Sequence, residues 1–183
     1  MATRSFLFLL GSSRADGNTE MLARIAAEQL PASAEQRWLH LRDLPLPEFE
    51  DLRHHPEALR AAPTGHAATL LEATLAATDV VIASPLYWYA VSSSTKRYLD
   101  HWSSWLKTPG VDFARRMAGK TLWGVTALAD RDPVAAEPLA GTLRNSAAYL
   151  GLRWGGVLLG NGTRPGDVRS DTEAVARAKT FFS

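Results

Sequence analysis

The sequence predicts an α/β fold in which helices cover both faces of a parallel sheet. Five short apolar runs alternate along the chain with five helical patterns of hydrophobic residues, and this alternation is typical of βαβ units. The run at residues 80–84, Val-Val-Ile-Ala-Ser, is almost entirely apolar, as expected of a strand that is buried on both faces. With right-handed crossovers we predict a five-stranded parallel sheet in the order 2-1-3-4-5.

The individual elements follow from the hydrophobic periodicity. Strands are predicted at residues 6–10, 36–41, 80–84, 120–128 and 152–159. Helices are predicted at residues 19–30, 66–77, 92–106 and about 136–150. A last helix is expected to begin at a capping box formed by Ser170 and Glu173. Long loops are expected at residues 43–63 and 108–119.

The composition limits the class of protein. With 183 residues, of which 46% are hydrophobic and 21% charged, residues 1–183 are expected to form a single globular domain. Lys plus Arg total 20 against 19 for Asp plus Glu, which argues against a nucleic-acid partner. Because neither a signal peptide nor a run of about 18 apolar residues is found, we expect no membrane partner and a cytoplasmic location. The absence of cysteine excludes disulfides, thiolate zinc sites and cysteine-ligated iron–sulfur clusters.

The loop after the first strand has the residues of an anion site. Residues 11–19 read Gly-Ser-Ser-Arg-Ala-Asp-Gly-Asn-Thr and lead into a helix, whose first N–H groups favour a phosphate monoester. The hydroxyls of Ser12, Ser13 and Thr19 add donors, and Arg14 adds a planar cation. The motifs of nucleoside-triphosphate loops and of dinucleotide-binding loops are both absent. A turn that merely caps a helix has a similar composition. Arg14, taken alone, could instead form a surface ion pair with Asp16.

A second candidate site follows the third strand. Residues 85–90 read Pro-Leu-Tyr-Trp-Tyr-Ala and place three successive aromatic side chains at the carboxyl end of a parallel strand. Ligand crevices in open α/β sheets lie at such ends, next to the point where the strand order reverses. In the order 2-1-3-4-5 that point lies between the first and third strands. We therefore predict that the anion loop and the aromatic loop flank one ligand.

Three other features have competing interpretations. The helix at residues 92–106 carries a large aromatic stripe, which is core, an oligomer interface, or both. His54 and His55 are adjacent and lack a third ligand at a suitable spacing, so no metal site is expected. Asp130 and Asp132 are a possible acid–base pair, but a polar turn beside a proline explains them better.

Two motifs resemble the flavodoxin-like NAD(P)H-dependent flavin reductases, also called the NADPH-dependent FMN reductase family. The phosphate loop of that family typically reads Gly-Ser-x-Arg-x-x-Gly-Asn-Thr, which is matched here by Gly11, Ser12, Arg14, Gly17, Asn18 and Thr19. Its third-strand loop and helix typically read Pro-x-Tyr-Trp and then Lys-x-x-x-Asp, matched by Pro85, Tyr87, Trp88, Lys96 and Asp100. Residues 149–154 also resemble the family's stretch before the fifth strand, so the likeness covers nearly the whole chain.

The chain departs from the family pattern in several places. Ser13 and Ser92 stand where many relatives have proline, and both are compatible with a turn and with the first turn of a helix. The loop at residues 127–134 lacks the glycines that relatives often place near the flavin edge. The cysteine motif of the iron–sulfur branch is missing, which excludes electron transfer through a cluster.

The resemblance implies a flavodoxin-like three-layer α/β/α sandwich with FMN as cofactor. The residues implied to bind the phosphate are Ser12, Ser13, Arg14, Gly17, Asn18 and Thr19. Those implied to lie against the ring are Pro85, Leu86, Tyr87, Trp88 and Tyr89. Backbone N–H groups of residues 87–90 are candidates to stabilise the reduced ring. No catalytic side chain and no metal are expected, because the cofactor carries the reactive atoms.

The implied activity is an FMN-dependent NAD(P)H oxidoreductase. Hydride from NADPH or NADH would reduce bound FMN, and the electrons would go to a small-molecule acceptor such as a quinone, an azo compound, a metal ion or free flavin. The family's site usually lies at a dimer interface, so a homodimer is expected, with Tyr98, Trp102 and Trp105 as its candidate interface. One alternative is a flavodoxin-like electron carrier, which the near-neutral charge disfavours. Another is a flavin- or phosphate-sensing module.

Overall fold

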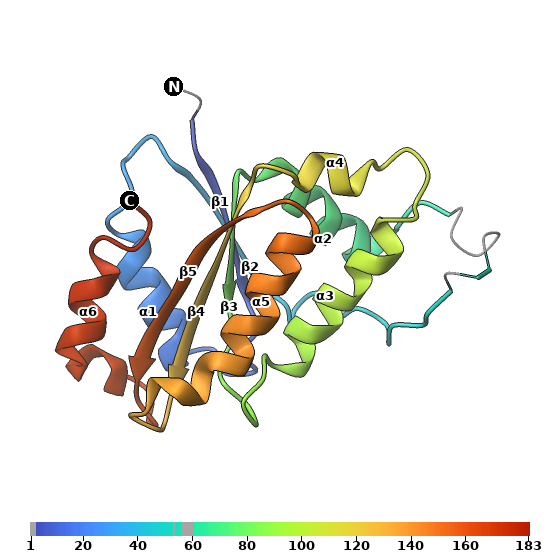
Figure 1. The fold of residues 1–183 in the computed structure, drawn as a ribbon. Helices are drawn as coiled ribbons and strands as arrows, with labels where there is room; N and C mark the ends of the chain where they lie inside the picture. The colour runs from blue at the N-terminus through green and yellow to red at the C-terminus, as the bar shows by residue number, and fades with distance from the viewer. Residues whose placement is uncertain (1–2, 53, 56–60) are drawn as a thin grey trace.

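The computed structural model of the chain describes residues 3–52, 54–55 and 61–183. Within them, five strands form one parallel sheet in the predicted order, β2-β1-β3-β4-β5 (Figure 1). The strands are β1 (Ser5–Leu10), β2 (Glu35–His40), β3 (Asp79–Ala83), β4 (Thr121–Leu128) and β5 (Arg153–Asn161). All five carboxyl ends therefore lie at the same edge of the sheet.

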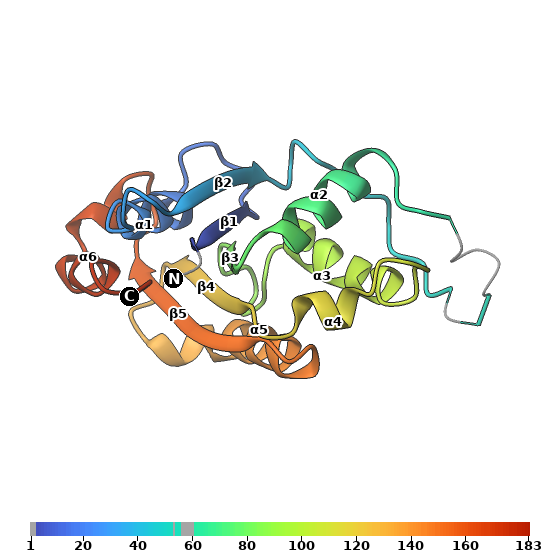
Figure 2. The ribbon, with the colours of Figure 1, turned by 90° about the horizontal axis from the view of Figure 1, so that it is seen from above.

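Helices cover both faces of this sheet, which gives the predicted three-layer architecture. They are α1 (Asn18–Ala27), α2 (Gly65–Ala76), α3 (Ser93–Trp105), α4 (Phe113–Met117), α5 (Glu137–Tyr149) and α6 (Thr172–Ala178). Two short 3-10 helices are η1 (Pro133–Ala136) and η2 (Asp167–Ser170). Seen from above, α1 and α6 lie on one side of the sheet and α2, α3 and α5 on the other (Figure 2). No helix in the described part of the chain is long and apolar enough to cross a membrane.

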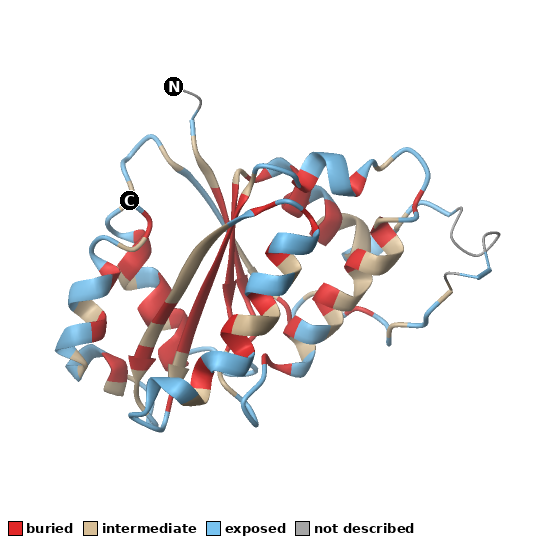
Figure 3. Cartoon of the chain, in the orientation of Figure 1, coloured by how far each residue is buried: buried red, intermediate tan, exposed pale blue. Residues whose placement is uncertain are grey.

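Each face of the sheet has its own hydrophobic core, because successive strand side chains point to opposite faces. Leu7, Leu9, Val80 and Ile82 belong to the cluster that packs against α2, α3 and α5. Phe6, Phe8, Leu10 and Val81 belong to the cluster that packs against α1 and α6. Every residue of β3 is buried, as its apolar sequence predicts (Figure 3).

Two local predictions are wrong. The predicted loop at residues 108–119 contains the short helix α4. The predicted capping box of Ser170 and Glu173 is absent, because Asp171 caps α6 instead and accepts the Ala174 N–H at 3.0 Å. The second carboxylate oxygen of Asp171 accepts the Asn161 N–H at 2.8 Å, so this cap also joins α6 to the end of β5. Part of the predicted loop at residues 43–63, namely positions 53 and 56–60, lies outside the described residues.

The aromatic stripe of α3 is core. Tyr98, Trp102 and Trp105 are all buried within the chain, and the exposed fraction is at most 5%. The ring of Phe113 from α4 covers them, with ring centroids 5.8 Å from Trp102 and 5.6 Å from Trp105. Tyr98 shares a 2.7 Å hydrogen bond with Thr74 of α2, and burial raises the pKa of Tyr98 to about 12. The core interpretation of this stripe is therefore confirmed; the short helix α4, which the sequence did not predict, supplies a packing partner.

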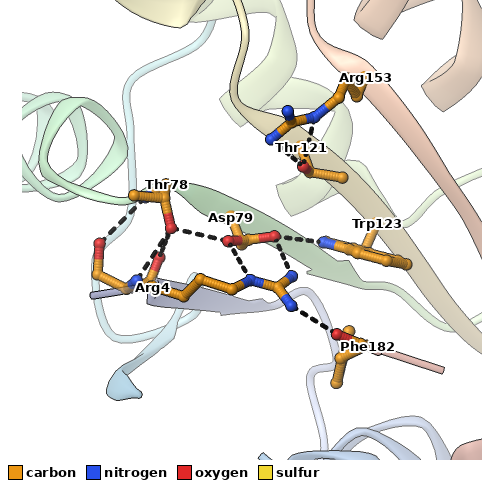
Figure 4. A network of polar contacts seen from close by, with 8 residues as sticks. Arg4, Thr78, Asp79, Thr121, Trp123, Arg153 and Phe182 are labelled. Atoms are coloured by element: carbon orange, nitrogen blue, oxygen red, sulfur yellow. Dashed lines mark hydrogen bonds and ion pairs between the residues drawn. The ribbon is translucent and has the colours of Figure 1, made fainter. Parts of the chain in front are cut away.

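A polar network closes the amino ends of the strands. Asp79, the first residue of β3, is 3% exposed and receives Nε and Nη2 of Arg4 at 3.2 and 2.6 Å (Figure 4). Trp123 Nε1 and the Thr78 hydroxyl also donate to it, at 2.9 and 2.7 Å. Burial raises the pKa of Asp79, but the hydrogen bonds outweigh it and hold the pKa below its ordinary value. Arg4 further donates to the Phe182 carbonyl at 2.7 Å, which ties the two chain ends together.

Candidate functional site

The predicted anion loop lies at the carboxyl edge, between β1 and α1. It begins where β1 is still paired with β3, since the Gly11 N–H donates to the Ala83 carbonyl at 2.9 Å. Gly17 is the N-cap residue of α1, and no side chain caps that helix. The first turn of α1 therefore keeps N–H groups that have no partner within the helix, as an anion site requires.

The side chains of this loop leave donors for a ligand. The Ser12 oxygen accepts the Arg14 N–H at 3.0 Å, and the Thr19 oxygen accepts the Ala127 N–H at 3.2 Å. Both residues are buried, and neither hydroxyl donates to an acceptor among the described residues. Ser13 and Arg14 are exposed. In the described part of the chain Arg14 forms no ion pair, so its guanidinium is available to an anion.

Asn18 has a structural role that the motif did not reveal. Its amide nitrogen donates to the Arg164 carbonyl at 2.8 Å, and its amide oxygen accepts the Val168 N–H at 3.3 Å. A Cβ at Gly162 would lie 2.8 Å from the same amide nitrogen, so a larger residue there would displace Asn18. The side chain holds the segment after β5 against the anion loop, so its first role is structural, and the backbone N–H of Asn18 is the donor that the start of α1 offers to a phosphate.

The aromatic loop after β3 is a tight and strained hairpin. Tyr87 and Ala90 exchange two backbone hydrogen bonds of 3.1 Å, and between them Trp88 and Tyr89 have φ angles of 49° and 63°. Two successive residues with positive φ are typical of a type I′ turn, which normally contains Asn and Gly. For bulky residues this conformation costs on the order of 1 to 3 kcal/mol each, and such strain is common at binding sites.

The hairpin also exposes its aromatic side chains. The exposed fractions are 46% for Tyr87, 94% for Trp88 and 59% for Tyr89, whereas Pro85 and Leu86 are half-buried. Because Tyr87 and Ala90 bond to each other, only Trp88 and Tyr89 keep backbone N–H groups without a partner in the described structure. The predicted set of ring-binding N–H donors is thereby reduced to these two.

The structure brings the two predicted loops together. The hydroxyl of Ser94, in the first turn of α3, donates to the Gly11 carbonyl at 3.1 Å. A Cβ at Gly11 would lie 2.0 Å from Thr95 Oγ1, so only glycine allows this approach of α3 to the anion loop. Lys96 and Asp100, which complete the second family motif, form an ion pair of 2.6 Å on the surface of α3. The two loops that the strand order predicts to flank a ligand crevice are therefore neighbours in the fold.

The two aspartates of the loop after β4 both accept backbone hydrogen bonds. Asp130 accepts the Asp132 N–H at 3.0 Å, and Asp132 accepts the Val134 N–H at 2.9 Å, so both carboxylates shape the turn. The Asn161 amide of β5 donates to three successive carbonyls from Leu128 to Asp130, at 2.8 to 3.2 Å. Among the described residues, His, Asp and Glu side chains form no group of three that could hold a metal ion.

The comparisons with known proteins identify the family. The family described as NADPH-dependent FMN reductase matches residues 5–151. YwqN of Bacillus subtilis (strain 168), provisionally described as an NAD(P)H-dependent FMN-containing oxidoreductase, is 29% identical over 173 residues, which are 94% of this chain and 93% of YwqN. The chain belongs to the NADPH-dependent FMN reductase family. Its class is therefore the FMN-dependent NAD(P)H oxidoreductases.

Two solved structures show the same fold. The Trp repressor binding protein from Bacillus subtilis superposes with a TM-score of 0.77 at 24% identity and covers 97% of both chains. The NAD(P)H:quinone oxidoreductase from Methanothermobacter marburgensis superposes with a TM-score of 0.74 at 14% identity, over 97% of this chain and 94% of its own.

The residues of the crevice fit FMN. The uncapped start of α1 and the unpaired Arg14 suit one phosphate group. The exposed aromatic hairpin suits a flat ring, and its positive φ angles are the kind of backbone strain that is common at binding sites.

Proposed function

We propose that FMN binds with its phosphate at residues 12–19 and its ring against residues 85–89, and that the reduced protein passes electrons to a quinone. The observation that carries this proposal is the strained, exposed aromatic hairpin beside an uncapped helix start. Each feature alone has a purely structural explanation, but a single phosphate-bearing aromatic ligand accounts for both.

At the phosphate end, binding rests on the backbone of the first turn of α1, on the hydroxyls of Ser12 and Thr19, and on Arg14. Hydrogen bonds to a charged group contribute roughly 1.5 to 3 kcal/mol each. Ser13 is exposed and reaches the phosphate only if the loop closes over it. Since these contacts all address the phosphate, riboflavin, which lacks it, should bind much more weakly than FMN.

At the ring end, the chain orients the reaction and supplies no proton donor. FMN, when bound, supplies the chemistry of hydride acceptance and electron donation. Tyr87, Trp88 and Tyr89 form the apolar wall, and the free N–H groups of Trp88 and Tyr89 are the donors that would stabilise negative charge on a reduced ring. This arrangement explains why the site needs neither a catalytic triad nor a metal.

The quinone assignment rests on shape. A planar, largely apolar acceptor can stack in the place that the nicotinamide has left, beside exposed aromatic side chains. The fold neighbour from Methanothermobacter marburgensis is itself a quinone oxidoreductase. If nicotinamide and quinone use the same place in turn, steady-state kinetics should be ping-pong, with parallel double-reciprocal lines.

An anaerobic half-reaction tests the proposal. Purified protein loaded with FMN should lose its yellow colour in one fast phase on addition of NADPH or NADH. A benzoquinone added afterwards should restore the colour without more nicotinamide. FMN that binds but stays oxidised under excess NADPH and NADH would favour the carrier or sensing alternatives. A faster return of colour with an azo dye, ferric ion or free flavin than with the quinone would instead change the acceptor.

We further propose a homodimer, with its interface at the surface where α3 meets α5. A shallow groove of about 330 Å³ lies between α3 and α5; Leu99, Trp102 and Leu106 contribute to its lining, and Tyr149 beside it is 80% exposed. A second copy would cover this apolar surface. Light scattering should give twice the chain mass. Tyr149→Glu should yield a folded monomer, whereas Arg144→Glu on the same helix should not. A monomeric parent protein at micromolar concentration would refute the dimer.

A further inference from the structure

A fully buried hydroxyl lies at the base of the aromatic hairpin. Ser84 follows β3 directly and is 0% exposed. Its oxygen accepts the Ser92 N–H at 2.9 Å, and its hydroxyl donates to the Pro85 carbonyl at 3.1 Å. Its own N–H donates to the Val125 carbonyl of β4 at 3.0 Å. One side chain, fixed to the central strands, thus holds both ends of the segment that carries the three aromatic residues.

This contact explains how the strained turn persists. Residues with unfavourable φ angles keep them only where the surroundings fix the backbone on both sides. The Tyr87–Ala90 pair closes the hairpin near its tip, and Ser84 closes it at the base. Without the Ser84 hydroxyl, the Ser92 N–H would have no partner in a position that is 4% exposed. The base would then open to find water, and the aromatic wall would move.

The same segment holds the anion loop through a different serine. Ser94, two residues after Ser92, donates to the Gly11 carbonyl at 3.1 Å. Ser84 therefore supports the ring side of the crevice, and Ser94 supports the phosphate side. The chain offers two matched Ser→Ala variants, each of which removes one hydroxyl.

We propose that Ser84 is a positioning residue for the flavin ring, which it never touches and on which it acts through the backbone of residues 85–92. The inference rests on the proposed function, because it assumes that the ring lies against this hairpin. The proposal predicts that the rate of flavin reduction and the affinity for FMN respond differently to loss of the Ser84 hydroxyl. Loss of the Ser84 hydroxyl should disturb the geometry of hydride transfer while the phosphate contacts, and with them FMN affinity, stay in place.

The first test uses the FMN-free protein and measures amide hydrogen exchange. In Ser84→Ala the amides of Tyr87 and Ala90 should exchange at least tenfold faster than in the parent, while β3 amides keep their protection. Ser94→Ala should leave the Tyr87 and Ala90 amides unchanged. Equal protection in Ser84→Ala and in the parent would refute the role of the Ser84 hydroxyl in holding the hairpin, whether or not the protein binds FMN.

The second test uses FMN-loaded protein and measures binding and reduction separately. We expect the rate of bleaching by NADPH or NADH in Ser84→Ala to fall by about tenfold to a hundredfold, since a shift of about 1 Å costs that much. The Kd for FMN should change by less than about threefold, and the absorption band of bound FMN should shift. Ser94→Ala should show the reverse pattern, with weaker FMN binding and normal bleaching once the site is saturated.

The outcomes separate the two proposals. If the parent protein does not bind FMN, or binds it without bleaching, the proposed function fails. The exchange test then still shows whether the Ser84 hydroxyl holds the hairpin. If the parent bleaches and Ser84→Ala bleaches equally fast with an unshifted band, only the positioning role fails. If Ser84→Ala does not fold, Ser92→Pro removes the same hydrogen bond from its other end, at a residue whose φ of −58° suits proline. Because the Ser92 side chain also caps α3 by accepting the Thr95 N–H at 3.3 Å, Ser92→Ala, which removes that cap but keeps the Ser92 N–H, is the control. Ser92→Pro should bleach more slowly than Ser92→Ala, and equal rates would refute the role.

Discussion

The two ends of the sheet are built in opposite ways. At the amino ends, Asp79 is buried and receives four hydrogen bonds, from Arg4, Thr78 and Trp123. At the carboxyl ends, α1 has no capping side chain, and Trp88 is 94% exposed on a backbone with positive φ. At the amino end the polar groups find their hydrogen-bond partners within the chain, whereas the carboxyl end presents hydrogen-bond donors and aromatic side chains that a ligand would contact. The difference indicates that the fold is stabilised at the end opposite to its proposed binding site, so that the proposed binding end can keep strain and unpaired donors.

The largest expected effect is on stability, from Asp79→Ala. Removing one partner of a buried ion pair typically costs about 3 to 5 kcal/mol. Arg4 is 40% exposed in its side chain, so water will rehydrate it in part and we expect about 2 to 4 kcal/mol. Urea unfolding measures this loss.

The control is Asp43→Ala, which removes an exposed partner of a 3.4 Å ion pair with Arg42; it should change stability by less than about 0.5 kcal/mol. In Asp79→Ala the FMN affinity of the folded fraction should stay the same. A parallel loss of FMN affinity would show that the two ends of the sheet are not independent.

The next effect is on binding, from Arg14→Ala. Loss of one charge-assisted contact with the phosphate should weaken FMN binding by about tenfold to a hundredfold, and riboflavin binding should not change. Fluorescence titration of both flavins gives the two Kd values. Arg115→Ala is the matched control, because Arg115 is also exposed but pairs with Asp112 at 2.7 Å. Equal losses for FMN and riboflavin would place the phosphate elsewhere.

A smaller effect is expected from Trp88→Gly, which should raise the stability of the FMN-free protein but lower the rate of flavin reduction. Glycine adopts positive φ without strain, and a side chain that is 94% exposed has almost no packing to lose. We expect the FMN-free protein to gain about 1 kcal/mol, or roughly 2 to 4 °C in Tm, while bleaching by NADPH becomes slower. A lower Tm would mean that the hairpin is not strained.

The parts of this molecule that the sequence predicts are those that depend on neighbouring residues. The apolar run of β3, the helical periodicities and the glycine, arginine and asparagine of the first loop are all local patterns, and they predict the sheet order and the family of the chain. The start of α6 was missed by one residue, because two adjacent residues, Ser170 and Asp171, are both suitable caps. The contact with Asn161 of β5 decides between them.

The parts that could not be predicted depend on contacts between distant segments. Asn18 bonds to residues 146 and 150 positions away, and Asp79 bonds to Arg4 across 75 positions. The type I′ hairpin could not be predicted for a further reason: its central positions hold neither Asn nor Gly. Local propensity argues against that turn, and only the closure by Ser84 and by the Tyr87–Ala90 pair imposes it.

The smallest expected effect is on stability at acid pH, and it comes from Asp79 at the amino end of the sheet. The pKa of Asp79 is lower in the folded chain than its ordinary value, so its contribution is complete above about pH 4. As the pH falls below that value, the unfolded chain takes up a proton that the folded chain does not, and stability declines. Asp79→Asn cannot take up this proton. Its Tm, although lower throughout, should therefore fall less between pH 6 and pH 3, by about 2 °C relative to the parent. Calorimetry at several pH values measures the two slopes. Parallel slopes would mean that other carboxylates, among them the cap residue Asp171, whose pKa is also lowered, determine the acid sensitivity of the fold.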